Sequence, residues 1–455
     1  MREPGAVLLV SCYELGHQPL GLAWPRAFLE RAGFVPDAID LSVEPLDETK
    51  VRRARLAAIA VPMHTALRLG VRAAERIRRI NPACRIVCHG LYAELNAEHL
   101  LGRYADFVLS GESEAALVDL VERLDRGEQL ARHQAPRLER LPFPVPRRDG
   151  LPALARYAAL ERDGRRLLAG YVETSRGCLH SCLHCPIPPV YGGRFFVVPH
   201  DVVLEDVRRL VAAGAQHITF GDPDFLNGPR HALRLVQAMH AEFPGLSYDC
   251  TAKIEHIVRH RERFTEFAAT GCVFVVSAVE SLSNVVLAQL EKGHTRADVQ
   301  VALDVLRQAG IALRPSFVPF TPWASLDDYL DLLDWVAQEE LVDQVDPVQF
   351  SIRLLIPQGS LLLARPGIQP FLRGLDAASF THRWTHPDPR MDLLQRDLNA
   401  LVEQAARSAQ DPAATFGRIR ALAYLRADRP AAAARFRAPP PERPIAPRLT
   451  EPWFC

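Results

Sequence analysis

The sequence lacks an excess of charge of one sign, and it lacks a long apolar run. Its 54 Lys and Arg residues balance 54 Asp and Glu residues, so no overall field draws the protein to nucleic acid or to an anionic membrane. No apolar stretch approaches the roughly 20 residues that span a bilayer. The apolar segment 6–10 is too short for the core of a signal peptide. We therefore expect a cytoplasmic protein with neither a nucleic-acid nor a membrane partner.

The sequence also lacks the paired cysteines of a disulfide framework. Its nine cysteines are an odd number, and a reducing compartment disfavours disulfides. Three of them, Cys178, Cys182 and Cys185, follow one another in the spacing CxxxCxxC. This spacing indicates a metal or cluster site.

What the sequence does contain is a repeated alternation of strand and helix patterns, which predicts an α/β protein. In residues 1–130 we expect a doubly wound parallel sheet. Its expected strands are 6–11, 36–41, 56–61, 85–88 and 106–109. The Pro-rich segment 131–165 is expected to be an extended linker between domains.

The alternation resumes in residues 166–360, where we expect a second domain. Strands are predicted at 168–173, 217–220, 246–252, 273–278, 312–317 and 347–353, with helices between them. This pattern predicts a complete or partial TIM-type (β/α) barrel, whose active site lies at the carboxyl ends of its strands. Residues 361–455 are predicted to form a mainly helical C-terminal extension.

The chemistry of three neighbouring cysteines favours an iron–sulfur cluster. Three thiolates can hold three irons of a cubane and leave the fourth iron open to a small chelating molecule. A zinc site that also uses His180 or His184 is the alternative. Structural zinc sites usually draw on two separated ligand pairs, however, and the sequence shows no second pair. Three inert core cysteines fit less well, because His, Ser and Gly crowd this loop.

Residues 174–186, TSRGCLHSCLHCP, resemble the signature of the radical S-adenosylmethionine (SAM) superfamily. His184 stands where that family usually has an aromatic residue before the last cysteine. The resemblance implies an enzyme with a [4Fe–4S] cluster on Cys178, Cys182 and Cys185, whose open iron is chelated by SAM. It also implies reductive cleavage of SAM to a 5′-deoxyadenosyl radical, with electrons from a donor such as flavodoxin or ferredoxin. No motif identifies the substrate, which can be a small molecule or a peptide.

Further resemblances to this family extend over residues 167–360 and suggest SAM-binding residues. Gly221, Asp222 and Asp224 follow an expected strand, where family members carry a short motif at the SAM methionine. The resemblance implies that Asp222 or Asp224 accepts from the SAM ammonium group. An Asp-rich turn explains each of these residues equally well when it is taken alone. Glu280 and Ser281 resemble the end of a Gly-Val-Glu-Ser motif, whose acidic residue approaches the ribose or methionyl part of SAM.

Two later segments complete the predicted SAM site. Arg314 and Ser316, on a late expected strand, are candidate contacts for a carboxylate. Residues 356–360 resemble a late turn of the family near the adenine, although a plain turn explains them too. No residue is singled out as a catalytic acid or base.

The segment 1–130 resembles the cobalamin-binding domain that precedes many radical SAM cores. Residues 111–114, Gly-Glu-Ser-Glu, match a Gly-Glu-x-Glu pattern after its fifth strand. The Asp-x-His-x-x-Gly motif that supplies a cobalt-ligating histidine is absent. His17 lies in the corresponding loop, but Leu15 and Leu20 replace the motif's Asp and Gly. Two alternatives stay open: a cobalamin without that axial histidine, and a domain that has lost the cofactor.

The last residues, 449–455 (LTEPWFC), resemble the start of the tail of radical SAM proteins that end in Cys-Cys-Ala-Glu-Pro or Cys-selenocysteine-Ala-Glu-Pro. Our hypothesis is that a selenocysteine codon follows Cys455, which would make the protein a selenoprotein. The alternative is a natural end with a free cysteine.

The sequence thus predicts a radical SAM oxidoreductase or transferase that acts on an unknown substrate. Two other hypotheses stand beside it: a cobalamin-dependent radical SAM methyltransferase, and an Fe–S electron carrier or redox sensor without SAM chemistry. A carrier needs neither an open iron nor Glu280, so replacement of Glu280 separates it from the two enzymes.

Overall fold

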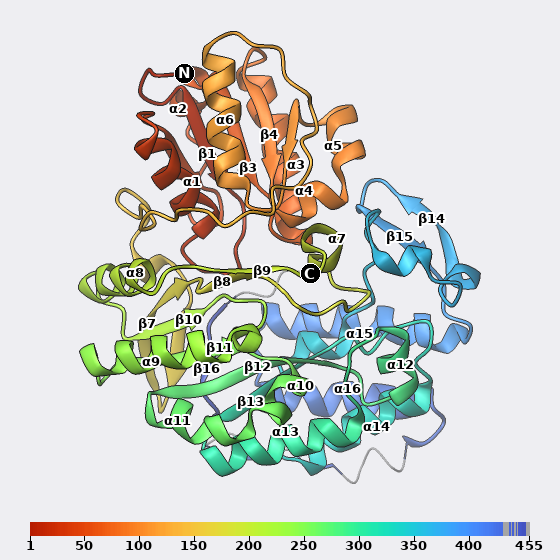
Figure 1. Cartoon of the computed structure of the whole chain (residues 1–455). Coiled ribbons are helices and arrows are strands. Elements are labelled where there is room, and N and C mark those ends of the chain that lie inside the picture. The colour runs from red at the N-terminus through yellow and green to blue at the C-terminus, as the bar shows by residue number, and fades with distance from the viewer. Residues whose placement is uncertain (431–435, 438, 441–442, 444, 452–455) are drawn as a thin grey trace.

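The computed structural model describes residues 1–430, 436–437, 439–440, 443 and 445–451, and its two large sheets lie one above the other (Figure 1). The N-terminal sheet, in red and orange, stands above the second sheet, in yellow to cyan. The segment that carries the three cysteines runs between them, next to α7 (Ile187–Tyr191).

Within the described chain, the N-terminal domain is a five-stranded parallel sheet in the order β2-β1-β3-β4-β5. Its strands are β1 (Val7–Ser11), β2 (Asp37–Asp40), β3 (Leu56–Ala60), β4 (Arg85–His89) and β5 (Phe107–Leu109). Its helices are α1 (Leu20–Arg31), α2 (Glu48–Arg53), α3 (His64–Ile80), α4 (Leu91–Leu95), α5 (Ala97–Arg103) and α6 (Ser113–Asp125). Apolar residues of α1 and α6 pack on one face and those of α3 and α5 on the other, which confirms the doubly wound fold.

The second sheet is a partial barrel in the order β13-β12-β11-β10-β7-β6-β16. Its parallel strands are β7 (Arg165–Val172), β10 (His217–Phe220), β11 (Ser247–Thr251), β12 (Cys272–Glu280) and β13 (Ala312–Phe317). Two antiparallel strands, β6 (Ala159–Arg162) and β16 (Arg448–Leu449), extend the β7 edge. The helices between the strands are α8 (His200–Ala212), α9 (Pro229–Glu242), α10 (Ile254–Arg259), α11 (Phe264–Ala269), α12 (Asn284–Gln289), α13 (Arg296–Ala309) and α14 (Leu326–Gln338).

One expected strand of the barrel is wrong. The segment predicted as a strand at 347–353 is the 3-10 helix η4 (Pro347–Ser351). Pro347 cannot donate to a strand ladder, and its fixed φ suits the first position of a helix. Strand β6 lies inside the segment that the sequence suggests is a linker.

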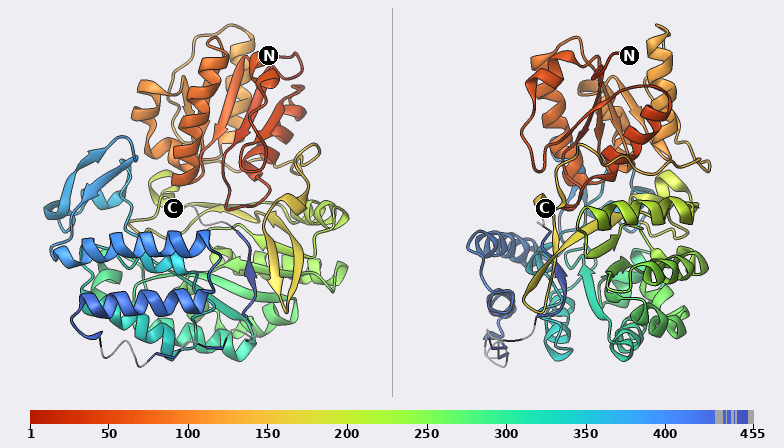
Figure 2. Two further views of the ribbon diagram at one scale, coloured as in Figure 1. Left: turned by 180° about the vertical axis from the view of Figure 1, so that it is seen from behind. Right: turned by 90° about the vertical axis from the view of Figure 1, so that its left-hand side faces the viewer.

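The C-terminal extension is mainly helical, as predicted. Helices α15 (Pro389–Arg407) and α16 (Pro412–Arg426) run side by side and share the main hydrophobic core with the barrel, as Figure 2 shows from behind. An unexpected hairpin, β14 (Leu372–Asp376) with β15 (Thr381–Trp384), precedes them. The proposed selenocysteine position falls beyond residues 452–455, which lie outside the described chain.

The two domains share apolar packing. Trp24 and Phe28 of α1 and Phe143 of the connecting segment belong to the same hydrophobic cluster as the barrel core. The polar groups that meet at the domain boundary therefore lie on a packed interface.

Among the described helices, none is long and apolar enough to cross a membrane.

Candidate iron–sulfur and SAM site

The cysteine loop begins at the carboxyl end of β7, where a barrel enzyme places its active site. A short hairpin, β8 (Ser175–Gly177) with β9 (Phe195–Val197), leads into it. Gly177 has φ +77, and a Cβ there would meet the Tyr191 ring at 2.6 Å and overlap the Arg194 carbonyl. Only glycine fits this close backbone approach, so Gly177 fixes the path of the chain into Cys178.

The three cysteines of the loop are unpaired and largely withdrawn from water. Cys178 and Cys182 are buried and Cys185 is half-buried. Burial is the main cause that raises the pKa of the Cys185 thiol to about 12, and the nearby Cys182 and Cys178 thiols contribute to this rise. The three cysteines lie within eight consecutive residues of one loop. Three free thiols grouped in one loop fit the donor set of a three-cysteine [4Fe–4S] site.

Asp222 and Asn227 hold the cysteine loop from the segment that follows the neighbouring strand β10. The Asn227 carbonyl oxygen accepts from the Leu179 backbone at 3.3 Å and lies 3.9 Å from the Cys178 sulfur. The Asp222 carboxylate accepts from the Thr174 backbone at 2.9 Å, and from the hydroxyls of Thr174 and Ser175. Burial raises the pKa of Asp222 to about 6, although these hydrogen bonds oppose the rise.

The residues around Asp222 show how tightly this corner is packed. A Cβ on Gly221 would overlap the Tyr171 ring, so the backbone can approach β7 only as glycine. Both oxygens of Asp222 are occupied by the start of the cysteine loop. The geometry therefore makes Asp222 a residue that positions the loop.

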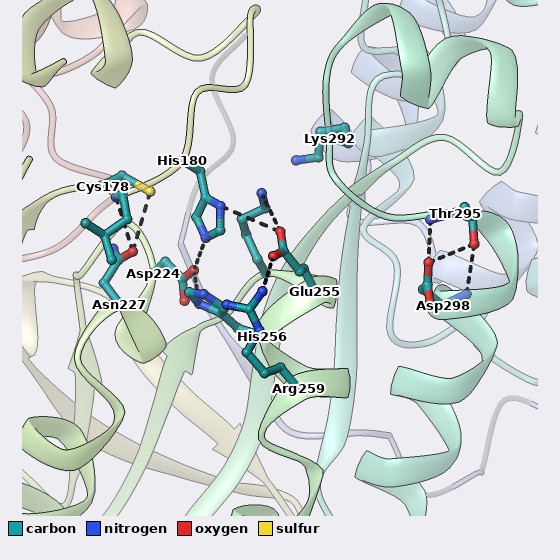
Figure 3. A network of polar contacts seen from close by, with 12 residues as sticks. Cys178, His180, Asp224, Asn227, Glu255, His256, Arg259, Lys292, Thr295 and Asp298 are labelled. Atoms are coloured by element: carbon teal, nitrogen blue, oxygen red, sulfur yellow. Dashed lines mark hydrogen bonds and ion pairs between the residues drawn. The ribbon is translucent and has the colours of Figure 1, made fainter. Parts of the chain in front are cut away.

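Asp224 faces two histidines, which Figure 3 shows converging beside Cys178. Its carboxylate oxygen Oδ2 lies 2.7 Å from Nδ1 of His256 and 3.5 Å from Nε2 of His180. Burial raises the pKa of Asp224, but the two imidazoles outweigh burial and lower it.

Glu280 lies at the end of β12 in a strained conformation. Its φ is +64, a left-handed value that is costly for a residue with a Cβ and that tends to mark functional sites. Its oxygen Oε1 lies 3.3 Å from Nζ of Lys292 and 3.1 Å from Nε2 of His184. Burial raises the pKa of Glu280, but Lys292 and His184 outweigh burial and lower it to about 2. The structure thus brings an ionised carboxylate against the cysteine loop.

The other predicted SAM residues lie further apart. Ser281 is buried beside Glu280, and its hydroxyl accepts from the Ser283 backbone at 3.1 Å. Arg314 pairs with Asp346 at 3.0 Å, and it shares a small cavity with Ser316 that residues of the C-terminal segment also line. At the late turn, the Ser360 hydroxyl lies 3.5 Å from the carbonyl of Leu183 in the cysteine loop.

Arg176 ties the N-terminal domain to the cysteine loop. Its guanidinium lies 2.7 Å from Glu114 and 3.5 Å from Glu112, both in the loop after β5, and 2.9 Å from Glu173. Tyr191 donates to Glu112 at 2.9 Å. The sequence does not predict this buried link. The Gly-Glu-Ser-Glu pattern was its only signal, because nothing local pairs it with Arg176.

A cavity of about 270 Å³ separates the N-terminal sheet from this loop, lined among others by Glu14, His89, Glu114, Glu173 and Gly221. Glu14 accepts from the backbone of Leu20 and Gly21 at 2.9 Å, so its carboxylate occupies the start of α1.

His17 does not face this cavity as an open ligand. Its ring stacks on Tyr171 at 4.5 Å, and its Nε2 lies 3.5 Å from Glu451. The histidine that could have served a cobalt ion is therefore engaged with the barrel and the C-terminal segment.

A buried three-cysteine loop at the carboxyl end of a partial barrel, facing an acidic residue at the end of β12, defines a class of iron–sulfur enzymes. Residues 172–336 match the family model of the radical SAM superfamily. The chain is an enzyme with a radical SAM domain, and such a domain implies a [4Fe–4S] cluster and SAM.

Curated relatives share part of this chain. Hopanoid C-3 methylase of Methylococcus capsulatus is 24% identical over 326 residues, which cover 67% of this chain and 62% of that protein. A putative methylthiotransferase of Methanocaldococcus jannaschii is 24% identical over 198 residues, which cover 40% of this chain and 42% of that protein. The chain thus spans less than two thirds of the length of either relative.

Solved structures share its architecture more widely. The cobalamin-dependent SAM radical enzyme OxsB superposes with a TM-score of 0.70 at 16% identity, covering 89% of this chain and 67% of that one. The radical SAM methyltransferase TsrM from Kitasatospora setae superposes with a TM-score of 0.60 at 19% identity, covering 73% of this chain and 70% of that one. At these identities the likeness concerns the fold, and it covers both domains in OxsB.

Proposed function

We propose that the chain cleaves SAM reductively at a [4Fe–4S] cluster held by Cys178, Cys182 and Cys185, and acts on a substrate that remains to be found. The observation that carries this proposal is the group of three free thiols beside the ionised carboxylate of Glu280. When bound, the cluster and SAM supply one electron and a 5′-deoxyadenosyl radical that abstracts a hydrogen atom. The electron donor is proposed to be a small protein such as flavodoxin or ferredoxin.

The protein's own residues orient these groups. Asp222 holds the start of the cysteine loop at Thr174, and Asn227 holds the loop at Leu179. Glu280 offers an ionised acceptor to a hydroxyl or ammonium group of SAM, and Lys292 keeps that carboxylate in place. Burial of the loop between the two domains limits access of water to a reactive radical.

The first experiment is an anaerobic assay of SAM products. The cluster is reconstituted, SAM and a strong reductant are added, and products are identified by mass spectrometry. We expect 5′-deoxyadenosine from the wild type and none from Cys182→Ala. Cys84→Ala, a buried cysteine in the N-terminal domain, is the matched control and should keep the activity.

The same preparation tests the electron-carrier hypothesis. Glu280→Gln removes the charge but keeps the shape. An enzyme should retain its four irons and lose SAM affinity, whereas a carrier should be unchanged in both. A fully loaded wild type that neither binds nor cleaves SAM would contradict the proposal.

The second candidate is a cobalamin-dependent methyltransferase, favoured by one observation. The fold match to OxsB extends over 89% of the chain, so it includes the N-terminal domain. Two cavities open at that domain's edge: one of about 270 Å³ beside the cysteine loop, and one of about 570 Å³ lined by Cys12, Arg68 and Tyr157 among others. The larger lies within the roughly 300–1,000 Å³ of drug-sized sites, and no histidine of the described chain lines it, so it offers no axial imidazole to a bound cobalamin.

Cobalamin is therefore tested directly. The protein is incubated with hydroxocobalamin, desalted, and its cobalt content is measured beside its iron content. About one cobalt per chain, together with S-adenosylhomocysteine among the SAM products, would favour methyl transfer. Absence of cobalt with unchanged formation of 5′-deoxyadenosine would favour a domain that has lost the cofactor.

The finer family assignment rests on the C-terminal residues. The motif at 449–455 supports kinship with the radical SAM proteins that carry a Cys-Cys-Ala-Glu-Pro or Cys-selenocysteine-Ala-Glu-Pro tail. The nucleotide sequence after the Cys455 codon tests it. A UGA codon followed by an Ala-Glu-Pro frame supports the assignment, and any other sequence contradicts it.

A further inference from the structure

A second group of ligand-type side chains lies beside the cysteine loop. His180 comes from the loop itself, between Cys178 and Cys182. Asp224 follows β10, and His256 lies on α10, which follows β11. Three separate segments at the carboxyl side of the sheet thus bring one side chain each to a common point (Figure 3).

The donor atoms of this group converge without hydrogen bonds. One nitrogen from each histidine and one oxygen of Asp224 all lie within 4.8 Å of one another. Nδ1 of His256, Nε2 of His180 and Oδ2 of Asp224 make no hydrogen bond to any described residue. The side chains of Asp224 and His256 are 0% and 5% exposed, so these atoms are shielded from water. The three atoms face one another as ion pairs without a hydrogen bond of good geometry, and a shared cation would satisfy all three at once.

We propose that His180, Asp224 and His256 bind a divalent transition metal, with Zn²⁺ as the defining probe, next to the iron–sulfur cluster. Two imidazoles and one carboxylate form a donor set that suits Zn²⁺ and Fe²⁺. In a tetrahedral zinc site with bonds of about 2.0–2.1 Å, donors lie roughly 3.3 Å apart. The distances from Asp224 to the two histidines, 2.7 and 3.5 Å, bracket that value.

The surroundings orient two of the three ligands. The second oxygen of Asp224, Oδ1, accepts from the Leu226 backbone at 3.0 Å, which fixes the carboxylate plane. The other nitrogen of His180 faces Glu255 at 3.7 Å, and Glu255 is itself held by Arg259 at 2.8 Å. A carboxylate behind a metal-ligating histidine is the usual arrangement around protein metal sites.

Three protein ligands leave a coordination position open. Water, or an oxygen or nitrogen atom of a substrate, is the class of ligand that such a position takes. Because His180 lies between two of the cluster cysteines, this metal would stand beside the place where the radical is formed. The site is independent of cobalamin and of the cluster's own donors, which are sulfur atoms.

The competing role of Asp224 is the one that the sequence suggests, an acceptor for the SAM ammonium group. The two roles exclude each other, because both use the unpartnered oxygen Oδ2. The zinc content therefore tests whether Asp224 binds a metal, and the SAM affinity tests whether Asp224 binds SAM.

The experiment uses the full chain with its cluster already reconstituted, so that the three cysteines are occupied. Loosely bound metal is removed with a mild chelator, a slight excess of Zn²⁺ is added, and the desalted protein is analysed for zinc and iron. We expect about one zinc beside four irons. The zinc K-edge absorption spectrum should show only nitrogen or oxygen neighbours at about 2.0–2.1 Å and no sulfur at about 2.3 Å.

Two variants and one control locate the zinc. Asp224→Asn keeps an acceptor for the Leu226 backbone, and His256→Gln keeps a polar side chain of similar length. Each should weaken zinc binding at least about tenfold while the iron content stays at the wild-type value. His260→Gln, at the residue directly after α10 and outside the donor group, should keep the zinc.

Three results would overturn the proposal. They are a wild type without zinc, a sulfur shell around the zinc, and variants that hold zinc as well as the wild type. If no zinc binds and Asp224→Asn lowers SAM affinity, Asp224 belongs to the SAM site. None of these readouts requires SAM cleavage. The metal proposal can therefore fail while the proposed function stands, and the proposed function can fail while the metal proposal stands.

Discussion

Replacement of Arg176 by Met should destabilise the joint between the two domains. Arg176 is 12% exposed and faces Glu112, Glu114 and Glu173, of which Glu112 is 0% exposed. Within the described residues, its guanidinium lies within 3.5 Å of all three carboxylates. Removal leaves buried negative charges close to one another without a counter-charge.

The expected loss follows from this geometry. Removing one partner of a buried ion pair costs about 3–5 kcal/mol, because the remaining charge stays desolvated. In domains of about 150–250 residues, each kcal/mol of lost stability lowers the unfolding midpoint by about 2–4 °C. The apparent midpoint of Arg176→Met should therefore fall by about 6 °C or more. Arg208→Met is the matched control. Arg208 pairs with Glu242 at the surface, where water and salt screen the pair, so its loss should move the midpoint little.

The loss of stability caused by Arg176→Met should depend on pH. Burial raises the pKa of Glu112 to about 7, while Arg176 lowers it. A carboxyl with a raised folded-state pKa adds stability below its ordinary value near 4.5, and this contribution is lost as pH rises through about 7. Without Arg176 the pKa of Glu112 rises further, so the midpoint difference between wild type and Arg176→Met should be larger at pH 8 than at pH 5.5.

The assay is thermal unfolding followed by circular dichroism at one heating rate, on cluster-loaded protein at both pH values. A midpoint of Arg176→Met within 2 °C of the wild type, or a difference that does not grow with pH, would refute the reasoning.

Three further outcomes are expected. Cys182→Ala should lose most of its iron after reconstitution, measured by iron analysis, because a three-thiolate cluster site cannot spare a ligand. Gly177→Ala should lower cluster loading several-fold, since its Cβ has no room, whereas Gly192→Ala has φ +56 but open space and should cost only about 1 kcal/mol in thermal unfolding. Lys292→Met should lower stability at pH 7 by about 3 kcal/mol, because it leaves Glu280 buried without its cation. The Glu280 contribution is present above its ordinary pKa of 4.5 and is lost as pH falls through about 2, so the Lys292→Met penalty in unfolding experiments should shrink in acid.

Much of the architecture could be predicted from local patterns. Parallel βα units can be predicted from short apolar runs separated by amphipathic helices, as in β3 and α3. The exception at η4 arose because the alternation of apolar and polar residues after Pro347 fits a strand pattern, while the missing donor of Pro347 favours the start of a helix. The hairpin β14–β15 was missed because its strands carry few buried apolar residues.

The sequence by itself determined the chemistry of the cysteine loop, because the three ligands are neighbours in the chain and their spacing is a local property. It also placed Glu280 at the end of a strand, where the site lies. Only the tertiary structure decided what each acidic residue does. Asp222 holds the loop, Glu280 meets His184 and Lys292, and Asp224 meets His180 and His256. These pairings join segments far apart in sequence, and their geometry is set by how the strands of the partial barrel pack, which no local pattern records.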